Sequence, residues 1–139
     1  AATFRLHKEK EPPTVVQTRK WRYRYLDGRD MVAVRTRRDL SDGDKRCSWT
    51  PGTKQDELLP LYYDQLPAAG SGELIFVTEG ETCADRLRDL GLHAASVPAG
   101  AGSWKSGVPV LDRFTSNRLI LCPDRDLVGS ELMIRLATA

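Results

Sequence analysis

Several signatures of common functional classes are missing from this chain of 139 residues. It has no GxxxxGK[ST] loop, so we do not expect it to hydrolyse nucleotides as a P-loop motor does. Its three cysteines lie far apart and none belongs to a CxxC pair, which excludes a zinc ribbon. His7 and His93 are too isolated to indicate a zinc site or a catalytic triad. With no apolar run near membrane-spanning length and no signal-like N-terminus, the sequence favours a reduced, intracellular protein without a membrane partner.

The charges are unevenly distributed along the chain. The net charge is only +2, but residues 1–70 carry 14 Lys+Arg against 10 Asp+Glu, and residues 71–139 carry 7 against 9. A basic first half favours a phosphate-bearing partner and an acidic second half favours a metal site, although solvated surface explains so small an excess equally well. Hydrophobic residues make up 40% of the chain, enough for one ordinary domain, alone or with a smaller appendage.

The first half of the chain has the period of two that is typical of strands. Aromatic and basic residues alternate over residues 20–25, so one strand face is aromatic and the other is basic. The turn LDGRD at 26–30 predicts a hairpin with a returning strand at 31–39, and a third strand is expected at 45–49. The basic side chains of this segment are a candidate phosphate track for nucleic acid or nucleotides, or simply a solvated face that protects a sheet edge. They are Arg22, Arg24, Arg35, Arg37, Lys45 and Arg46.

The second half has a different pattern, in which apolar runs alternate with helical segments. A boundary falls near Gly70, which divides the chain into a basic β-rich segment, 1–70, and an α/β domain, 71–139. The domain is predicted to be a parallel sheet with right-handed crossovers. Its expected strands are residues 73–78, 92–97 and 118–122, and its expected helices are 82–91, 108–114 and 131–139. Since the chain begins without methionine and ends on a predicted helix, we expect a piece of a longer protein.

Two of these strands end in acidic residues. The strand at 73–78 leads into Glu79 and Gly80, and the strand at 118–122 leads through a proline into Asp124 and Asp126, with Gly129 permitting the turn into the last helix. If the two strands are parallel neighbours, the three carboxylates converge at one sheet edge. Crowded carboxylate oxygens favour a hard cation such as Mg²⁺. The ordinary alternative is that Asp126 caps the helix that follows it.

These motifs together resemble the TOPRIM domain, the catalytic domain of bacterial-type DNA primases, of type IA and type II topoisomerases and of several nucleases. The resemblance covers residues 73–139 and rests on EGE at 79–81, the ADxLxxLG helix, PAGAGSW at 98–104 and the DxDxxG strand end. It is greatest to phage- and plasmid-type primases and primase-helicases, and residues 21–49 are similar to the small basic β segment that often precedes the domain. The resemblance implies a Rossmann-like parallel sheet with flanking helices behind a small antiparallel segment.

The resemblance also implies roles for individual residues. Glu79 would be the acid of the first motif, a general acid or base or a metal ligand, and Asp124 and Asp126 would bind Mg²⁺ or Mn²⁺. In the glycine-rich loop, Gly100 and Gly102 either permit a turn or let backbone amides and Lys105 approach a phosphate. The implied activity is Mg²⁺-dependent nucleotidyl transfer that makes RNA primers in DNA replication.

The implied partners are a single-stranded DNA template, nucleotides, and a helicase domain or protein. The implied location is the cytoplasm of a bacterial or phage-infected cell. Two alternatives remain open: a nuclease or topoisomerase fragment, and a non-catalytic nucleic-acid-binding module.

Overall fold

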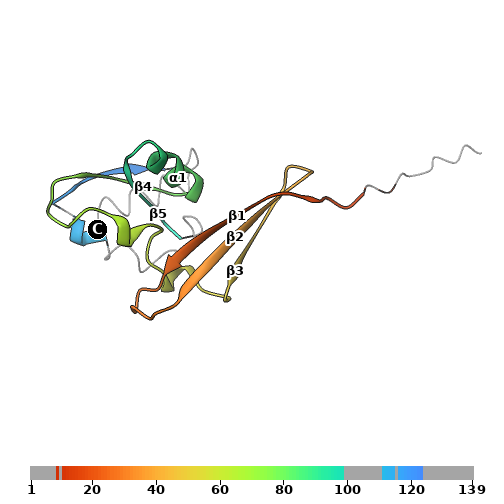
Figure 1. Cartoon of the computed structure of the whole chain (residues 1–139), viewed down its shortest axis with the longest axis horizontal. Coiled ribbons are helices and arrows are strands. Elements are labelled where there is room, and N and C mark those ends of the chain that lie inside the picture. Colours follow the sequence, from red (N-terminus) through yellow and green to blue (C-terminus); the bar gives the residue numbers. More distant parts are fainter. Residues whose placement is uncertain (1–8, 10, 99–110, 115, 124–139) are drawn as a thin grey trace, which may run out of the picture.

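The computed structural model describes residue 9 and residues 11–98, 111–114 and 116–123. Two three-stranded sheets follow one another along the chain, the first antiparallel and the second parallel (Figure 1). Two short 3₁₀ turns, Gln55–Glu57 and Tyr63–Gln65, lie between the sheets in the sequence. A third 3₁₀ turn, Asp112–Phe114, precedes the last described strand.

The antiparallel sheet has the strand order β1-β2-β3. Tyr23 on the first strand pairs with Ala33 on the second, and Arg35 pairs with Trp49 on the third. Gly28 and Gly43, in the two connecting turns, have φ of +77° and +86°, a conformation that favours glycine. One end of the sheet projects well beyond the rest of the molecule (Figure 1). The strands are β1 (Val15–Arg24), β2 (Val32–Leu40) and β3 (Lys45–Thr50).

The parallel sheet has the strand order β5-β4-β6 and is accompanied by the helix α1 (Glu81–Asp89). Gly91, with φ of +82°, ends the helix: its N–H donates to the Arg88 carbonyl at 2.9 Å, and the N–H of Leu92 donates to the Leu87 carbonyl at 3.0 Å. This is the Schellman arrangement, in which a left-handed glycine satisfies the last helical carbonyls. The strands are β4 (Leu74–Thr78), β5 (His93–Ser96) and β6 (Arg118–Cys122).

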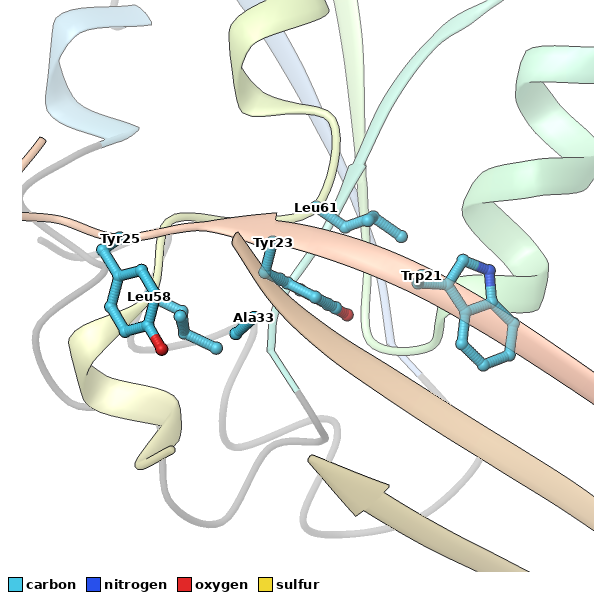
Figure 2. Close-up of a cluster of buried hydrophobic side chains, with 6 residues drawn as sticks. All are labelled: Trp21, Tyr23, Tyr25, Ala33, Leu58 and Leu61. Carbon is cyan, nitrogen blue, oxygen red and sulfur yellow. The ribbon is translucent and has the colours of Figure 1, made fainter. Parts of the chain in front are cut away.

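Each sheet has its own cluster of buried side chains. The cluster of the antiparallel sheet contains Trp21, Tyr23, Tyr25, Ala33, Leu58 and Leu61 (Figure 2). The cluster of the parallel sheet contains Ile75, Val77, Val97, Leu111 and Phe114. Residues 57–61 join the two sheets, because the N–H of Leu59 donates to the Arg24 carbonyl at 2.9 Å and the N–H of Leu61 donates to the Ser96 carbonyl at 2.8 Å.

The predicted fold class, a TOPRIM or Rossmann-like parallel sheet with flanking helices, is wrong for the described part of the chain. That part is a mixed α/β fold with one α-helix, and its antiparallel strands of 10, 9 and 6 residues are longer than its parallel strands of 5, 4 and 5. Of the predicted helix of 108–114, residues 108–110 lie outside the described residues, Leu111 is helical, and Asp112–Phe114 form a 3₁₀ turn. The last predicted helix, 131–139, lies outside the described residues.

The apolar residues of α1 do not all face the core. Their spacing places Cys83, Ala84, Leu87 and Leu90 on one face of the helix, but Leu90 is 76% exposed and Cys83 is exposed as well. The buried residues of the helix are Ala84 and Glu81. The helix therefore buries the carboxylate of Glu81 and leaves the apolar Leu90 exposed. Burial of this carboxylate is possible because Tyr23 on β1 donates a hydrogen bond to it.

Candidate nucleic-acid interface and acidic strand end

The two strands that end in acidic residues are neighbours. β4 and β6 are parallel, and Thr78 is directly opposite Cys122, so both strands end at the same level of the sheet. Glu79 follows Thr78 immediately and is buried, with 8% of its surface exposed. The Thr78 hydroxyl donates to the Gly80 carbonyl at 2.9 Å, which fixes the backbone on the far side of Glu79. The condition for convergence, parallel neighbouring strands, is therefore met.

The ligand set predicted for a metal ion falls only partly on described residues. Asp124 and Asp126 follow Cys122 by two and four positions and lie outside the described residues, as do Gly100, Gly102, Lys105 and Gly129. Within the part of the chain that the structure describes, no group of three or more His, Cys, Asp or Glu side chains is placed to hold a metal ion. Glu79 supplies one carboxylate at this edge, and a carboxylate is a donor that suits Mg²⁺.

Gly80 does not need to be glycine on backbone grounds. It is the N-cap of α1, with φ of −120° and ψ of 148°, an extended conformation that any residue adopts. A Cβ atom at this position would have no neighbour within 4 Å. The structure therefore shows neither a backbone nor a steric requirement for glycine at position 80.

Two carboxylates that the sequence analysis did not select face the antiparallel sheet. Glu81 and Asp85 are one helical turn apart on α1, so they project from the same side of the helix. The Tyr23 hydroxyl donates to Glu81 Oε1 at 2.9 Å, and Trp21 Nε1 donates to Asp85 Oδ2 at 2.8 Å. The Tyr62 hydroxyl donates to the other oxygen of Asp85. The sequence does contain a signal for these contacts. Two carboxylates four residues apart on a helix match two aromatic donors two residues apart on a strand.

The phenol groups in this network have shifted pKa values. Burial, followed by the charge and hydrogen bond of Glu81, raises the pKa of Tyr23 well above its ordinary value. Burial, followed by the hydrogen bond and charge of Asp85, raises the pKa of Tyr62 to about 12. Both phenols therefore stay protonated and remain hydrogen-bond donors at neutral pH.

The cross-strand register divides the predicted basic track between the two faces of the antiparallel sheet. Arg35, Arg37 and Lys45 lie on the face that carries Trp21 and Tyr23, called here the inner face. On this face Arg35 is paired with Glu81, and Arg37 is paired with Asp39. The cations of the opposite face, called here the basic face, are Lys20, Arg22, Arg24, Arg38 and Arg46. The strand positions on this face include no acidic residue. Lys20 and Arg38 thus join Arg22, Arg24 and Arg46, as the period of two along each strand would have indicated.

A pocket of about 430 Å³ lies where the basic face meets the second 3₁₀ turn. Lys20, Arg22 and Arg24 line it together with Tyr62, Asp64 and Gln65. Among the described residues, none of these three cations has an ion-pair partner. Three cations beside a single carboxylate repel one another, and an anion in the pocket would relieve that repulsion. The pocket therefore suits a phosphate group.

No protein-family model, no curated protein and no solved structure matches the chain. In the described part of the chain, no helix is long and apolar enough to cross a membrane.

Proposed function

We propose that this chain is part of a nucleic-acid enzyme, the DNA primase or primase-helicase that its acidic motifs resemble, and that it takes part in Mg²⁺-dependent synthesis of RNA primers on single-stranded DNA. The observation that carries the proposal is the basic face: five cations on one side of a sheet, without an acidic residue among them. The other side of that sheet is hydrogen-bonded to α1, which begins two residues after Glu79. A phosphate-binding surface and an acidic strand end thus belong to one connected structure.

Binding of the template is the first step that these residues support. Cations that neutralise phosphates release the counterions condensed on the nucleic acid, so the affinity does not depend on sequence and weakens with salt. Arg22 and Arg24 are exposed and unpaired, so they are available for this exchange. Arg35 and Arg37 are already neutralised by carboxylates and would contribute less.

Phosphoryl chemistry is the second step. Glu79, Asp124 and Asp126 would hold the metal ion, which neutralises charge on the reacting phosphate and orients the attacking hydroxyl when it is bound. The chain's own contribution is to place a buried carboxylate at the end of β4, level with the end of β6. The order of the acidic motifs, and not the fold, is what favours primer synthesis over the other reactions of nucleic-acid enzymes.

The binding step is tested by fluorescence anisotropy with labelled single-stranded DNA at several salt concentrations. Arg22→Ala/Arg24→Ala should weaken binding and reduce the magnitude of the log–log salt slope by about 1.4, that is, about 0.7 for each lost phosphate contact on a single strand. The matched control is Arg19→Ala/Arg37→Ala, which removes the same charge from the inner face of the same sheet. Equal losses for the two variants would show that only net charge matters and would refute a dedicated basic face.

The chemical step is tested by primer synthesis from ribonucleotides on single-stranded DNA with Mg²⁺ or Mn²⁺, using Glu79→Gln, Asp124→Asn and Asp126→Asn. Each variant should lose primer synthesis and bind the metal more weakly in calorimetric titrations made with nucleotide and DNA present, while its DNA affinity stays near that of the wild type. Cleavage of DNA instead of primer synthesis would assign the chain to the nucleases. DNA binding with neither activity under any metal would leave a non-catalytic binding module.

A further inference from the structure

Two parallel contacts join β1 to α1, and their spacing is matched. Trp21 and Tyr23 are two residues apart on the inner face of the strand, a rise of about 6.8 Å. Asp85 and Glu81 are four residues apart on the helix, a rise of about 6 Å. Trp21 reaches Asp85 at 2.8 Å and Tyr23 reaches Glu81 at 2.9 Å, so both hydrogen bonds form at once. Figure 2 shows Trp21 beside α1 and the hydroxyl of Tyr23 directed toward the same side.

Glu81 has a second partner on the same sheet. Arg35 Nε lies 3.1 Å from Glu81 Oε1, close enough for an ion pair although not aligned as a hydrogen bond. The position of Arg35 is set by Trp49, since its guanidinium carbon lies 5.7 Å from the centre of that ring. Trp49 also packs edge-on against Tyr23, with ring centres 5.0 Å apart. The carboxylate of Glu81 is therefore held by Tyr23 and Arg35, and both of these side chains contact Trp49.

The loop that carries Glu79 is fixed on both sides. On the sheet side, the Thr78 hydroxyl donates to the Gly80 carbonyl at 2.9 Å. The same carbonyl accepts the first hydrogen bond of α1, from the N–H of Ala84 at 3.3 Å. On the helix side, the side chain of Glu81 is bound to β1 and β2. Glu79 lies between these two attachments, so the direction of its carboxylate depends on both.

We propose that Tyr23 is a positioning residue that acts through Glu81 to hold the Glu79 loop, so that the antiparallel sheet sets the geometry of the acidic strand end. The effect of Tyr23 on metal binding rests on the proposed function. Its effect on the order of the Glu79 loop does not. Tyr23 itself touches neither metal nor substrate. It fixes the first residue of α1, and through it the backbone of Gly80 and Glu79.

Tyr23→Phe is the decisive variant, and Tyr25→Phe is its matched control. Both tyrosines are buried on the same strand face and each hydroxyl makes one hydrogen bond of 2.9 Å, but Tyr25 bonds to Thr53, away from α1. Amide hydrogen exchange of the full chain, followed by NMR, reports the order of the loop through the N–H of Ala84. We expect Tyr23→Phe to speed exchange at Ala84 about tenfold relative to the amides of β2, and Tyr25→Phe to leave that ratio unchanged.

The second readout is the affinity for Mn²⁺ in the presence of nucleotide and single-stranded DNA. Tyr23→Phe should weaken it about tenfold, equivalent to roughly 1.4 kcal/mol, without weakening DNA binding. Exchange that rises uniformly over all amides in Tyr23→Phe, with Mn²⁺ affinity unchanged, would show a purely structural hydrogen bond and overturn the proposal. If the wild type binds no metal, the proposed function fails, and the exchange ratio at Ala84 still decides whether Tyr23 positions the loop.

Glu81→Gln keeps the test decisive if Tyr23→Phe does not fold. The amide oxygen still accepts from Tyr23, but it no longer attracts Arg35 as a carboxylate does. Exchange at Ala84 should rise relative to the amides of β2. An Ala84 amide as protected in Glu81→Gln as in the wild type, with Mn²⁺ affinity also unchanged, would count against the proposal.

Discussion

At the scale of single residues, aromatic side chains contact charged groups of α1 that are only partly exposed. Trp21 and Tyr62 donate to Asp85, and Arg88 lies over the ring of Tyr62 with its guanidinium carbon 4.2 Å from the ring centre. A carboxylate taken out of water without such partners costs several kcal/mol, on the order of the whole stability of a small domain. The aromatic face of β1 therefore fills the core and also supplies hydrogen-bond donors to the carboxylates of α1.

The alkaline titration of the tyrosines tests this arrangement. The pKa of Tyr62 is raised from 10.0 to about 12 and that of Tyr23 is raised well above 10.0, so the folded protein keeps protons that the unfolded chain loses. Their contribution to stability is therefore complete below the unfolded pKa and is lost as the pH rises through the folded values. We expect the free energy of unfolding to fall between about pH 10 and 12, and to fall less steeply in Tyr62→Phe.

Denaturant unfolding at a series of pH values gives that free energy, and an ultraviolet titration of phenolate gives the ionisation itself. Tyr23 and Tyr62 should ionise above the ordinary phenol pKa. Ionisation of these two phenols at the ordinary value would contradict the hydrogen bonds to Glu81 and Asp85.

At the scale of elements, residues 57–61 are the connection on which the packing of both sheets depends. Leu58 and Leu61 are fully buried in the cluster of the antiparallel sheet, while the backbone of Leu59 and Leu61 bonds to β1 and β5. Apart from Glu57, the last residue of the first 3₁₀ turn, the segment contains no helix or strand. Its sequence shows only a short apolar patch interrupted by Pro60, which is why its role was not evident before the fold was known.

Leu58→Ala should destabilise the protein by about 2–5 kcal/mol, because it removes a fully buried side chain and leaves a cavity in the cluster. The matched control is Leu90→Ala, the same chemical change at a residue that is 76% exposed, and its effect should stay within about 0.5 kcal/mol. Chemical denaturation followed by circular dichroism measures both. Similar effects at the two positions would mean that Leu58 is not part of the core.

At the scale of the whole molecule, the two clusters are joined by residues 57–61 and by the polar contacts of α1. Asp85 accepts from Trp21 on β1 and from Tyr62 beside the second 3₁₀ turn, so it links three parts of the chain. Polar contacts of this kind hold only when the partners are all in place. The two sheets should therefore unfold together in the wild type.

Asp85→Ala should break that coupling. It leaves Trp21 Nε1 and the Tyr62 hydroxyl without their acceptor, at a cost of roughly 1–3 kcal/mol, and the two sheets should then unfold at different denaturant concentrations. With Trp104 replaced by Phe, the fluorescence of Trp21 and Trp49 follows the antiparallel sheet, and amide exchange in β4 follows the parallel one. Asp89→Ala, an exposed carboxylate one turn further along α1, should leave the transitions coincident. Coincident transitions in Asp85→Ala would show that the contacts of Glu81 and of residues 57–61 couple the sheets without Asp85.

Much of the local structure could be predicted from the sequence because it depends on neighbours along the chain. Alternation over residues 20–25 gave an aromatic and a basic strand face, and turn chemistry at Gly28 and Gly43 gave the strand ends. The acidic strand end at Glu79 was predicted in the same way. Asn117 shows the limit of such reasoning: its side chain accepts from the Gly70 N–H at 2.9 Å and donates to the Glu73 carbonyl at 3.2 Å, contacts that no local pattern indicates.

By itself, the sequence determined where strands begin, where α1 ends and which residue types share a strand face, because these depend on period and on backbone preference. Only the tertiary structure decided how the cations divide between the two sheet faces, because that depends on the register between strands and not on the period within one strand. It also decided that α1 buries Glu81, since a buried carboxylate is favourable only when donors from distant residues are in place.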